Sequence, residues 1–227
     1  VKLARIGIYQ RYYGGNIDEG WTRWLLEQYG FPFKVIMDKD IRDGKLSEKV
    51  DLLIFADDPT AIILGESKEA IEKALSERWK RPVVLPPIPP EYMSGIKKEG
   101  AEKLKEFVSN GGTVVLFNNA CEFGIEMFKL KLNNQAKNLD PKKFHCPGSI
   151  LRVNVDNTHM LCLGMPRKSF VFFHSSPILQ VLPSFYNDLY DAPITYPDKD
   201  IKESGWLIGE ELLSRKPALI QAKQDKG

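Results

Sequence analysis

The stretch "ARIGIYQRYYGGNIDEGWTRWLLEQYGFPFKVIMD" (residues 4–38) decides the fold class of this chain. Its two ends, ARIGIY (4–9) and KVIMD (34–38), are short apolar runs of the kind that form buried strands in a parallel sheet. Residues 18–29 have helical periodicity, and the sequence Gly-Phe-Pro stops the helix at Gly30. A strand–helix–strand order with short links predicts a right-handed parallel crossover, and therefore an α/β fold.

The predicted helix at 18–29 carries two tryptophans on one face. We expect Asp18 to cap its N-terminus, and Trp21 and Trp24 to face the sheet because they are three residues apart. If Trp24 fills the core, Trp24→Ala should cost roughly 3–5 kcal/mol of stability. By contrast, Tyr12→Ala should change stability little, because Tyr12 lies in the loop before the helix.

Further elements extend this pattern in both halves of the chain. In the first half we predict strands at 51–57 and 113–118, a helix at 67–80, a second helix before Gly111, and a proline-rich loop at 82–95. From about residue 148 the predicted strands follow one another with little helix: GSILRVNVD (148–156), SFVFFHSS (169–176), GWLIGEE (205–211) and ALIQAK (218–223). The sequence therefore predicts a mostly parallel α/β sheet with extra antiparallel strands in the second half.

Composition limits the classes of function. With 227 residues, 43% hydrophobic and 27% charged, residues 1–227 are predicted to form a single domain of ordinary globular composition. A net charge of +2 without a dense basic run argues against nucleic-acid binding, and no apolar run has membrane-spanning length. We expect no signal peptide within these residues, and cysteine usage does not indicate a cellular compartment. The chain starts close to a strand and ends just after one, so we expect a fragment of a longer protein.

Cys121 is the candidate for catalysis. The sequence "TVVLFNNACEFGIEMF" predicts strand, tight turn and helix, which is the order of a nucleophile elbow, and a helix N-terminus favours thiolate. However, Asn119 and Phe123 stand where an elbow usually has glycines, so we predict a structural cysteine. A base would have to come from one of the histidines: His145, His159 or His174. These lack the spacing of a zinc site, and phosphate-binding glycine motifs are missing, so no metal or cofactor is predicted for this chain.

The loop after the first strand is the candidate binding surface. Arg11, Tyr12 and Tyr13 follow the carboxyl end of that strand, and Asn118 and Asn119 follow the strand at 113–118. In open α/β sheets, ligands bind at the carboxyl edge. We therefore expect these five residues to form a surface for a ligand or a partner.

Four stretches together resemble a known domain: 16–33, 91–118, 147–166 and 204–227. They are similar to the C-terminal domain that follows the catalytic domain in a bacterial branch of the zinc carboxypeptidase (carboxypeptidase A-like) family. The resemblance implies a flavodoxin-like sandwich, similar in fold to class I glutamine amidotransferases, which would continue with one more strand and a closing helix. It also implies a peptidase domain as partner, peptide as substrate, zinc in that other domain, and a secreted or periplasmic parent.

The resemblance carries no catalytic residue into this chain. The His-x-x-Glu zinc motif of the peptidase is missing, and only Cys121 matches any part of a Cys-His-Glu amidotransferase triad. Three hypotheses therefore stand: a non-catalytic accessory domain of a zinc carboxypeptidase, a cysteine hydrolase or amidotransferase using Cys121, and a flavodoxin-like module that binds a sugar or another small molecule.

Overall fold

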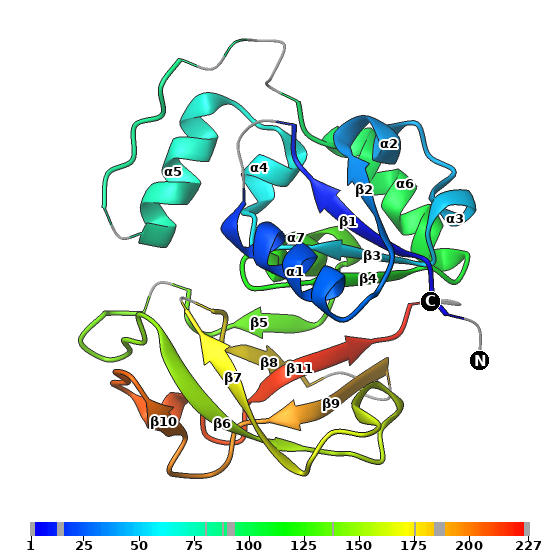
Figure 1. The fold of residues 1–227 in the computed structure, drawn as a ribbon. Coiled ribbons are helices and arrows are strands. Elements are labelled where there is room, and N and C mark those ends of the chain that lie inside the picture. The colour runs from blue at the N-terminus through cyan, green and yellow to red at the C-terminus, as the bar shows by residue number, and fades with distance from the viewer. Residues whose placement is uncertain are drawn as a thin grey trace. The chain divides into compact units, whose positions relative to one another are not determined.

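A computed structural model of the chain describes residues 3–12, 16–79, 81–87, 89, 94–137, 139–174, 176–183 and 189–224 (Figure 1). Its contacts divide the chain into two compact units. Unit 1 comprises Val1–Lys129 with Gln224–Gly227, and unit 2 comprises Leu130–Lys223. Each unit has its own hydrophobic core. That the two units together make one amidotransferase-like domain stays a prediction.

Unit 1 is an α/β structure built on a parallel sheet. Its elements are β1 (Ile6–Gln10), α1 (Ile17–Gln28), β2 (Phe33–Met37), α2 (Asp38–Arg42), α3 (Leu46–Lys49), β3 (Leu52–Phe55), α4 (Thr60–Leu64), α5 (Lys68–Trp79), α6 (Lys97–Ser109), β4 (Thr113–Leu116) and α7 (Ala120–Phe128). The strands pair in the order β2-β1-β3-β4, all parallel. This is the order of flavodoxin-like sheets, whose strand order reverses between β1 and β3. The predicted fold class is confirmed.

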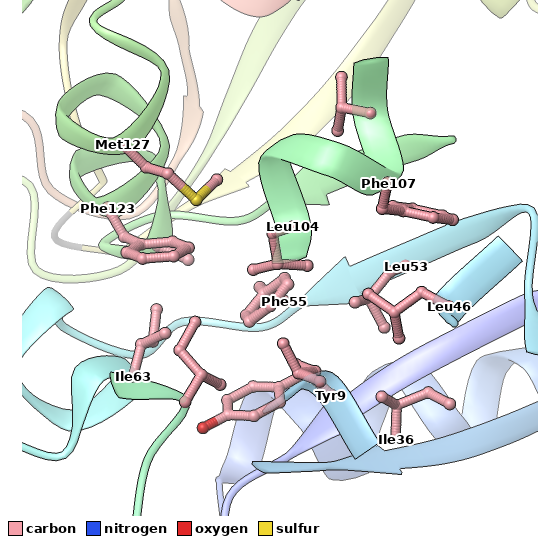
Figure 2. Close-up of a cluster of buried hydrophobic side chains, with 14 of the residues drawn as sticks. Tyr9, Ile36, Leu46, Leu53, Phe55, Ile63, Leu104, Phe107, Phe123 and Met127 are labelled. Atoms are coloured by element: carbon pink, nitrogen blue, oxygen red, sulfur yellow. The ribbon is translucent and has the colours of Figure 1, made fainter. Parts of the chain in front are cut away.

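One face of this sheet carries the core of unit 1 (Figure 2). Tyr9 stacks on Phe55 with ring centroids 4.6 Å apart, and Phe55 packs against Phe123 of α7 at 5.8 Å. Gly7 lets β1 lie close under this layer, because a Cβ there would be 2.9 Å from Val50 Cγ1. The apolar runs of the sequence thus form strands because helices α2, α3, α4, α6 and α7 bury their side chains.

Helix α1 covers the opposite face, and here two predictions are wrong. Trp21 is 61% exposed and Trp24 is 48% exposed, whereas Glu19 is buried. The cap is Asn16, whose Oδ1 accepts hydrogen bonds from the backbone N–H groups of Asp18 (2.9 Å) and Glu19 (3.2 Å). A three-residue spacing shows that the tryptophans share a face, but not which way that face points. The predicted core cavity of Trp24→Ala therefore has no basis in this structure.

Unit 2 is antiparallel, as predicted for the second half. Its elements are β5 (Leu132–Asn134), β6 (Ser149–Val155), the 3-10 helix η2 (Met160–Cys162), β7 (Lys168–Phe173), β8 (Leu179–Val181), β9 (Tyr190–Thr195), β10 (Lys202–Ser204), the 3-10 helix η4 (Glu210–Leu212) and β11 (Pro217–Ala222). The main sheet has the order β10-β6-β9-β11, with β7 also paired to β6, and β5 pairs with β8. Alternating side chains of β6, Leu151, Val153 and Val155, enter its core.

The predicted strand at 205–211 is wrong. Gly205 and Gly209 have φ values of +92° and +79°, which interrupt an extended chain. Between them, Ile208 makes only an isolated bridge with His145. A side chain at Gly209 would also collide with the backbone carbonyl of Lys143. This apolar run therefore passes through a turn instead of forming a strand of the sheet.

Candidate functional site

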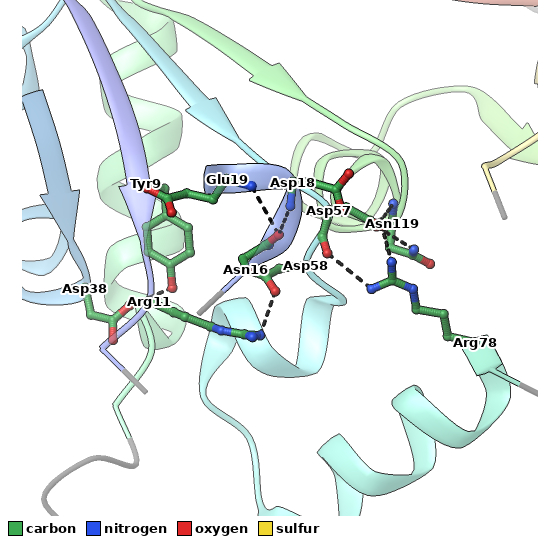
Figure 3. Close-up of polar contacts among 10 residues, drawn as sticks. All are labelled: Tyr9, Arg11, Asn16, Asp18, Glu19, Asp38, Asp57, Asp58, Arg78 and Asn119. Atoms are coloured by element: carbon green, nitrogen blue, oxygen red, sulfur yellow. Dashed lines mark hydrogen bonds and ion pairs between the residues drawn. The ribbon is translucent and has the colours of Figure 1, made fainter. Parts of the chain in front are cut away.

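The carboxyl ends of the parallel strands bring polar residues to one edge of unit 1 (Figure 3). Arg11 follows β1, Asp38 follows β2, Asp57 and Asp58 follow β3, and Asn119 follows β4. Because the strands are parallel, these positions meet at the same edge of the sheet. They form the polar cluster that we call the carboxyl-edge site.

Asp57 joins the ends of β3 and β4. Its Oδ1 accepts hydrogen bonds from the Asn119 backbone N–H (3.0 Å) and from Asn119 Nδ2 (2.6 Å). Its Oδ2 forms an ion pair with Arg78 of α5, which also donates to the Asp57 carbonyl at 3.3 Å. The Asp57 carboxylate is buried, so these donors replace the water that it loses. The turn after β4 is therefore held in one place.

The neighbouring Asp58 faces the loop after β1. Arg11 reaches it with a distance of 2.7 Å between Arg11 Nη1 and Asp58 Oδ1. Burial raises the pKa of Asp58 above its ordinary value, although Arg11 favours the charged form. This ion pair lies where the strand order reverses between β1 and β3, which is the position of the ligand crevice in flavodoxin-like sheets.

A second buried contact lies at the ends of β1 and β2. The Tyr9 hydroxyl donates to Asp38 Oδ1 at 2.6 Å, and the Gly95 backbone N–H donates to Asp38 Oδ2 at 2.8 Å. Burial, followed by the charge of Asp38, raises the pKa of Tyr9 well above its ordinary value. Tyr9 thus remains a hydrogen-bond donor, and Asp38 fixes the segment before α6 to the sheet.

The start of α1 closes the site with incompletely satisfied polar groups. Burial raises the pKa of Glu19, and this is opposed by Arg23, whose Nη1 lies 3.6 Å from Glu19 Oε1. Glu19 Oε1, Asn16 Nδ2 and Arg78 Nε are buried and lack a hydrogen bond of full geometry within the described part of the chain, although Arg23 lies beside Glu19 and Asp58 beside Asn16. Buried polar groups normally have partners, so these atoms mark a place where an internal water can bind.

The turn from β4 to α7 has the geometry of an elbow, but the strained residue is Asn118. Asn118 has φ +47°, whereas Cys121 lies within α7 and donates from its thiol to the Leu116 carbonyl at 3.3 Å. Burial, followed by the charges of Glu122 and Asp57, raises the pKa of Cys121 to about 12. The thiol is therefore neutral at physiological pH, and this geometry favours the structural role predicted for Cys121.

The three histidines all belong to unit 2 and have local contacts there. His145 packs edge-on against Trp206, His159 accepts a hydrogen bond from the Leu161 N–H at 3.3 Å, and His174 stacks on Phe172. Among the described residues, no group of three or more His, Cys, Asp and Glu side chains could hold a metal ion. No helix in the described ranges has the length and apolar character needed to cross a membrane.

The structure brings most of the predicted binding surface together. Arg11 and Asn119 bind the consecutive residues Asp58 and Asp57, so the loop after β1 and the turn after β4 meet at one edge. Tyr12 is exposed beside them, and Tyr13 lies outside the described residues. A binding role for this surface stays a prediction.

Sequence reasoning missed the acidic partners of these residues. Asp38 and Asp57 were the last residues of two predicted strands, and Asp58 follows the second directly, in "MDKD" and in "FADDP"; a polar residue at the end of a buried strand is itself a signal for the carboxyl edge. The true helix cap had a signal as well. Asn16 and Glu19 have the spacing of a capping box, which would have placed the helix start one residue earlier. Arg78 had no local signal, since it is 21 residues from Asp57 in the chain.

A shallow hollow of about 500 Å³ lies beside Tyr12 at the end of β2. Its other lining residues are mostly charged or polar: Met37, Asp38, Lys39, Asp40, Arg42, Asp43 and Ser94. The volume is within the usual range for small-molecule sites, but the lining is unlike the apolar wall of most of them.

Comparisons with known proteins concern the fold alone. No family model and no curated protein matches the chain. A solved structure described as a ThuA-like protein from Bacteroides uniformis has 12% identity and a TM-score of 0.47, covering 96% of this chain and 77% of its own. Another, described as a GMP synthase subunit from Thermoplasma acidophilum, has 10% identity and a TM-score of 0.46, covering 86% and 75%. The parent protein implied by the sequence resemblance stays a proposal.

Proposed function

We propose that this chain is a non-catalytic binding module, and that the carboxyl-edge site of unit 1 holds a polar ligand or a partner. The observation that carries this proposal is the identity of the elbow residue. In enzymes with a nucleophile elbow, the strained residue between strand and helix is the nucleophile. Here that residue is Asn118, with φ +47°. Its amide can donate and accept hydrogen bonds, but it is not a nucleophile.

The alternative of a cysteine hydrolase has less support. Cys121 is one helical turn beyond the elbow residue, its thiol donates to a backbone carbonyl, and its pKa is raised to about 12. Unit 1 contains no histidine to accept the thiol proton. A low thiol pKa or an adjacent base is what activates a cysteine, and neither is found here.

The character of the site favours a ligand with both donors and acceptors. The carboxyl edge combines the buried carboxylates of Asp57 and Asp58 with the guanidinium groups of Arg11 and Arg78, so it holds both acceptors and donors. A hydroxyl-rich or amide-rich ligand offers the matching groups. The polar hollow beside Tyr12 supports a small ligand of this kind, such as a sugar.

The sequence resemblance supplies a more specific partner. It implies that the module accompanies a zinc carboxypeptidase domain, against which the carboxyl edge would pack or whose peptide substrate it would hold. This part of the proposal rests on the four resembling stretches of sequence. In its favour, Tyr12 and Arg11 stand at the edge where such a contact would form. A His-x-x-Glu zinc motif in the same polypeptide is the expected finding.

The proposal is tested by assaying the chain for glutaminase, esterase and carboxypeptidase activity, with Cys121→Ser as the matched variant. We expect no turnover by either protein, and no labelling of folded Cys121 by iodoacetamide at neutral pH. Activity that Cys121→Ser abolishes, with the fold intact by circular dichroism, would contradict the proposal.

Binding is tested separately by NMR or calorimetry with panels of oligosaccharides and short peptides. For any compound of these panels that binds, Arg11→Ala and Asn118→Ala should each raise the dissociation constant about ten-fold or more, since each removes hydrogen bonds to the ligand. Glu106→Gln is the control, because its exposed carboxylate pairs with Lys103 on α6 and lines neither the hollow nor the carboxyl-edge site. Equal effects of all three substitutions would place the ligand elsewhere.

A further inference from the structure

Helix α1 leaves most of its large apolar side chains exposed. The stripe toward the sheet contains buried Glu19 and half-buried Thr22, Arg23 and Leu26, whereas Ile17, Trp21 and Leu25 are exposed on the outer stripe. A surface helix of a globular protein normally turns its apolar stripe inward. Large side chains are the most costly to leave in water, so this arrangement indicates that something else covers the outer stripe.

The exposed apolar surface continues beyond the helix. Trp24, Tyr29 and Phe31 are exposed around its C-terminal half. Val35 of β2 is exposed too, and it lies on the α1 side of the sheet because its neighbour Ile36 enters the core on the other side. Together with the outer stripe these side chains expose roughly 800 Å², more than the largest patch of a typical monomer and about what each partner of a stable dimer buries.

Gly20 supplies an independent observation. It lies inside α1, where glycine destabilises a helix, and apart from its sequence neighbours and the helix's own backbone no described atom comes within 4 Å of the position its Cβ would occupy. Nothing in the described chain therefore requires a glycine there. Trp21 and Trp24 stand beside it as an edge-to-face pair with centroids 5.5 Å apart. Gly20 thus leaves open space beside two exposed rings, which lets a partner helix approach closely.

The geometry points to a second copy of this chain as the partner, and we propose that α1 pairs antiparallel with α1 of that copy. The apolar positions Ile17, Trp21, Leu25 and Tyr29 are evenly spaced by four residues and symmetric about position 23. A twofold axis at that position places Ile17 against Tyr29 and Trp21 against Leu25 of the other copy, in both directions. Such self-complementarity is what an isologous dimer interface requires. The interface uses the outer stripe of α1, whereas the carboxyl-edge site uses Asn16 and Glu19 at the inward side of the helix start, and the inference does not depend on the proposed function.

The test is sedimentation equilibrium of the chain over a range of concentrations, with two variants of the interface. We expect a concentration-dependent dimer for the unmodified chain, and Trp21→Ser should raise its dissociation constant by about 100-fold, as expected for a central aromatic residue. Gly20→Gln should raise it by about ten-fold or more, because the new side chain fills the gap. Gly20→Gln should at the same time make the monomer more resistant to heat, since glutamine is the better helix former.

Trp206→Ser is the matched control, because Trp206 is an exposed tryptophan of unit 2. It should leave the dissociation constant unchanged. A chain that is monomeric at concentrations up to about 100 μM, far above the dissociation constant of a stable dimer, would overturn the proposal. So would a dimer that neither interface variant weakens. If the chain stayed monomeric and bound phosphatidylcholine vesicles through Trp21, the dimer proposal would fail, because the partner of α1 would be a lipid surface.

Discussion

The two faces of the parallel sheet in unit 1 differ in how they are covered, although Ile8 and Ile54 are buried on the α1 side as well. On one face, Phe55 and its neighbours are enclosed by five helices and stack ring against ring. On the other face, α1 turns Glu19 inward and Trp21 outward. The first face has the composition of a core, which stabilises the fold by burying apolar surface. The second keeps its apolar surface available, so we interpret it as a binding face.

The carboxyl edge belongs to neither face and shows a third kind of environment. Its charges are buried but paired within the chain: Asp57 with Arg78, and Asp58 with Arg11. Buried pairs of this kind add little net stability, but they fix the positions of the groups around them. Rigid polar groups at the end of a sheet are well suited to recognition.

The largest expected effect is on the enclosed face. Phe55→Ala should lower the free energy of unfolding of unit 1 by about 3–5 kcal/mol, because Phe55 is fully buried between Tyr9 and Phe123. Urea denaturation followed by hydrogen exchange of β3 measures this for unit 1 alone. A loss below about 1 kcal/mol would mean that this layer is not the packed core.

A smaller effect is expected at the carboxyl edge. Asp57→Asn should cost about 2–3 kcal/mol, because it leaves the Arg78 guanidinium buried without its carboxylate. The control is Asp40→Asn, which removes a partly exposed pair with Lys49 and should cost below about 1 kcal/mol. The same hydrogen-exchange measurement compares the two. If both variants lost equal stability, the buried pair of Asp57 with Arg78 would matter no more to the stability of unit 1 than the partly exposed pair of Asp40 with Lys49.

At Gly20 the expected change has the opposite sign. Gly20→Ala should raise the free energy of unfolding of the monomer by about 1 kcal/mol, because no described atom opposes the added methyl group and alanine favours the helix. Thermal unfolding in dilute solution checks this. Destabilisation would show that something within the chain covers α1.

The pH dependence of stability should reveal the buried Asp58. Burial raises its pKa above the ordinary value of 3.8, so the folded chain takes up this proton at a higher pH than the unfolded chain. As pH rises from 3.8 through the folded pKa, Asp58 therefore lowers the free energy of unfolding, and above the folded pKa its contribution is constant. The difference between the unmodified chain and Asp58→Asn isolates this group. If the free energy of unfolding of the unmodified chain instead rose with pH relative to that of Asp58→Asn over this interval, the ion pair with Arg11 would outweigh burial.

Sequence reasoning predicted the strands of unit 1 well, because buried parallel strands are short apolar runs wherever they occur. It failed for the direction of α1, because the spacing of Trp21 and Trp24 is the same whether they point inward or outward. Glu19 and Arg23 are also spaced to share one face of the helix, and this face points inward. A search for apolar periodicity cannot find an inward face that carries polar residues.

The candidate site was predicted in part for similar reasons. Arg11 and Asn119 were expected at one edge because parallel strands end together. Asp57 was predicted to be the last residue of a strand, but β3 ends at Phe55. Asp57 and Asp58 therefore lie beyond the strand, in the carboxyl-edge site. The boundary between the units at Lys129 was not predicted either, since the three-residue strand β5 is identified only by its pairing with β8.

Trp24→Ala, compared with Phe55→Ala in dilute monomeric chain, tests the contrast between the two faces most directly. Both substitutions remove a large aromatic ring, one from the outer stripe of α1 and the other from the enclosed layer. We predict that Trp24→Ala changes the free energy of unfolding of unit 1 by less than about 1 kcal/mol, as for other exposed positions, while Phe55→Ala costs about 3–5 kcal/mol. Equal losses would contradict the account, because they would show that α1 packs with its tryptophans against the sheet.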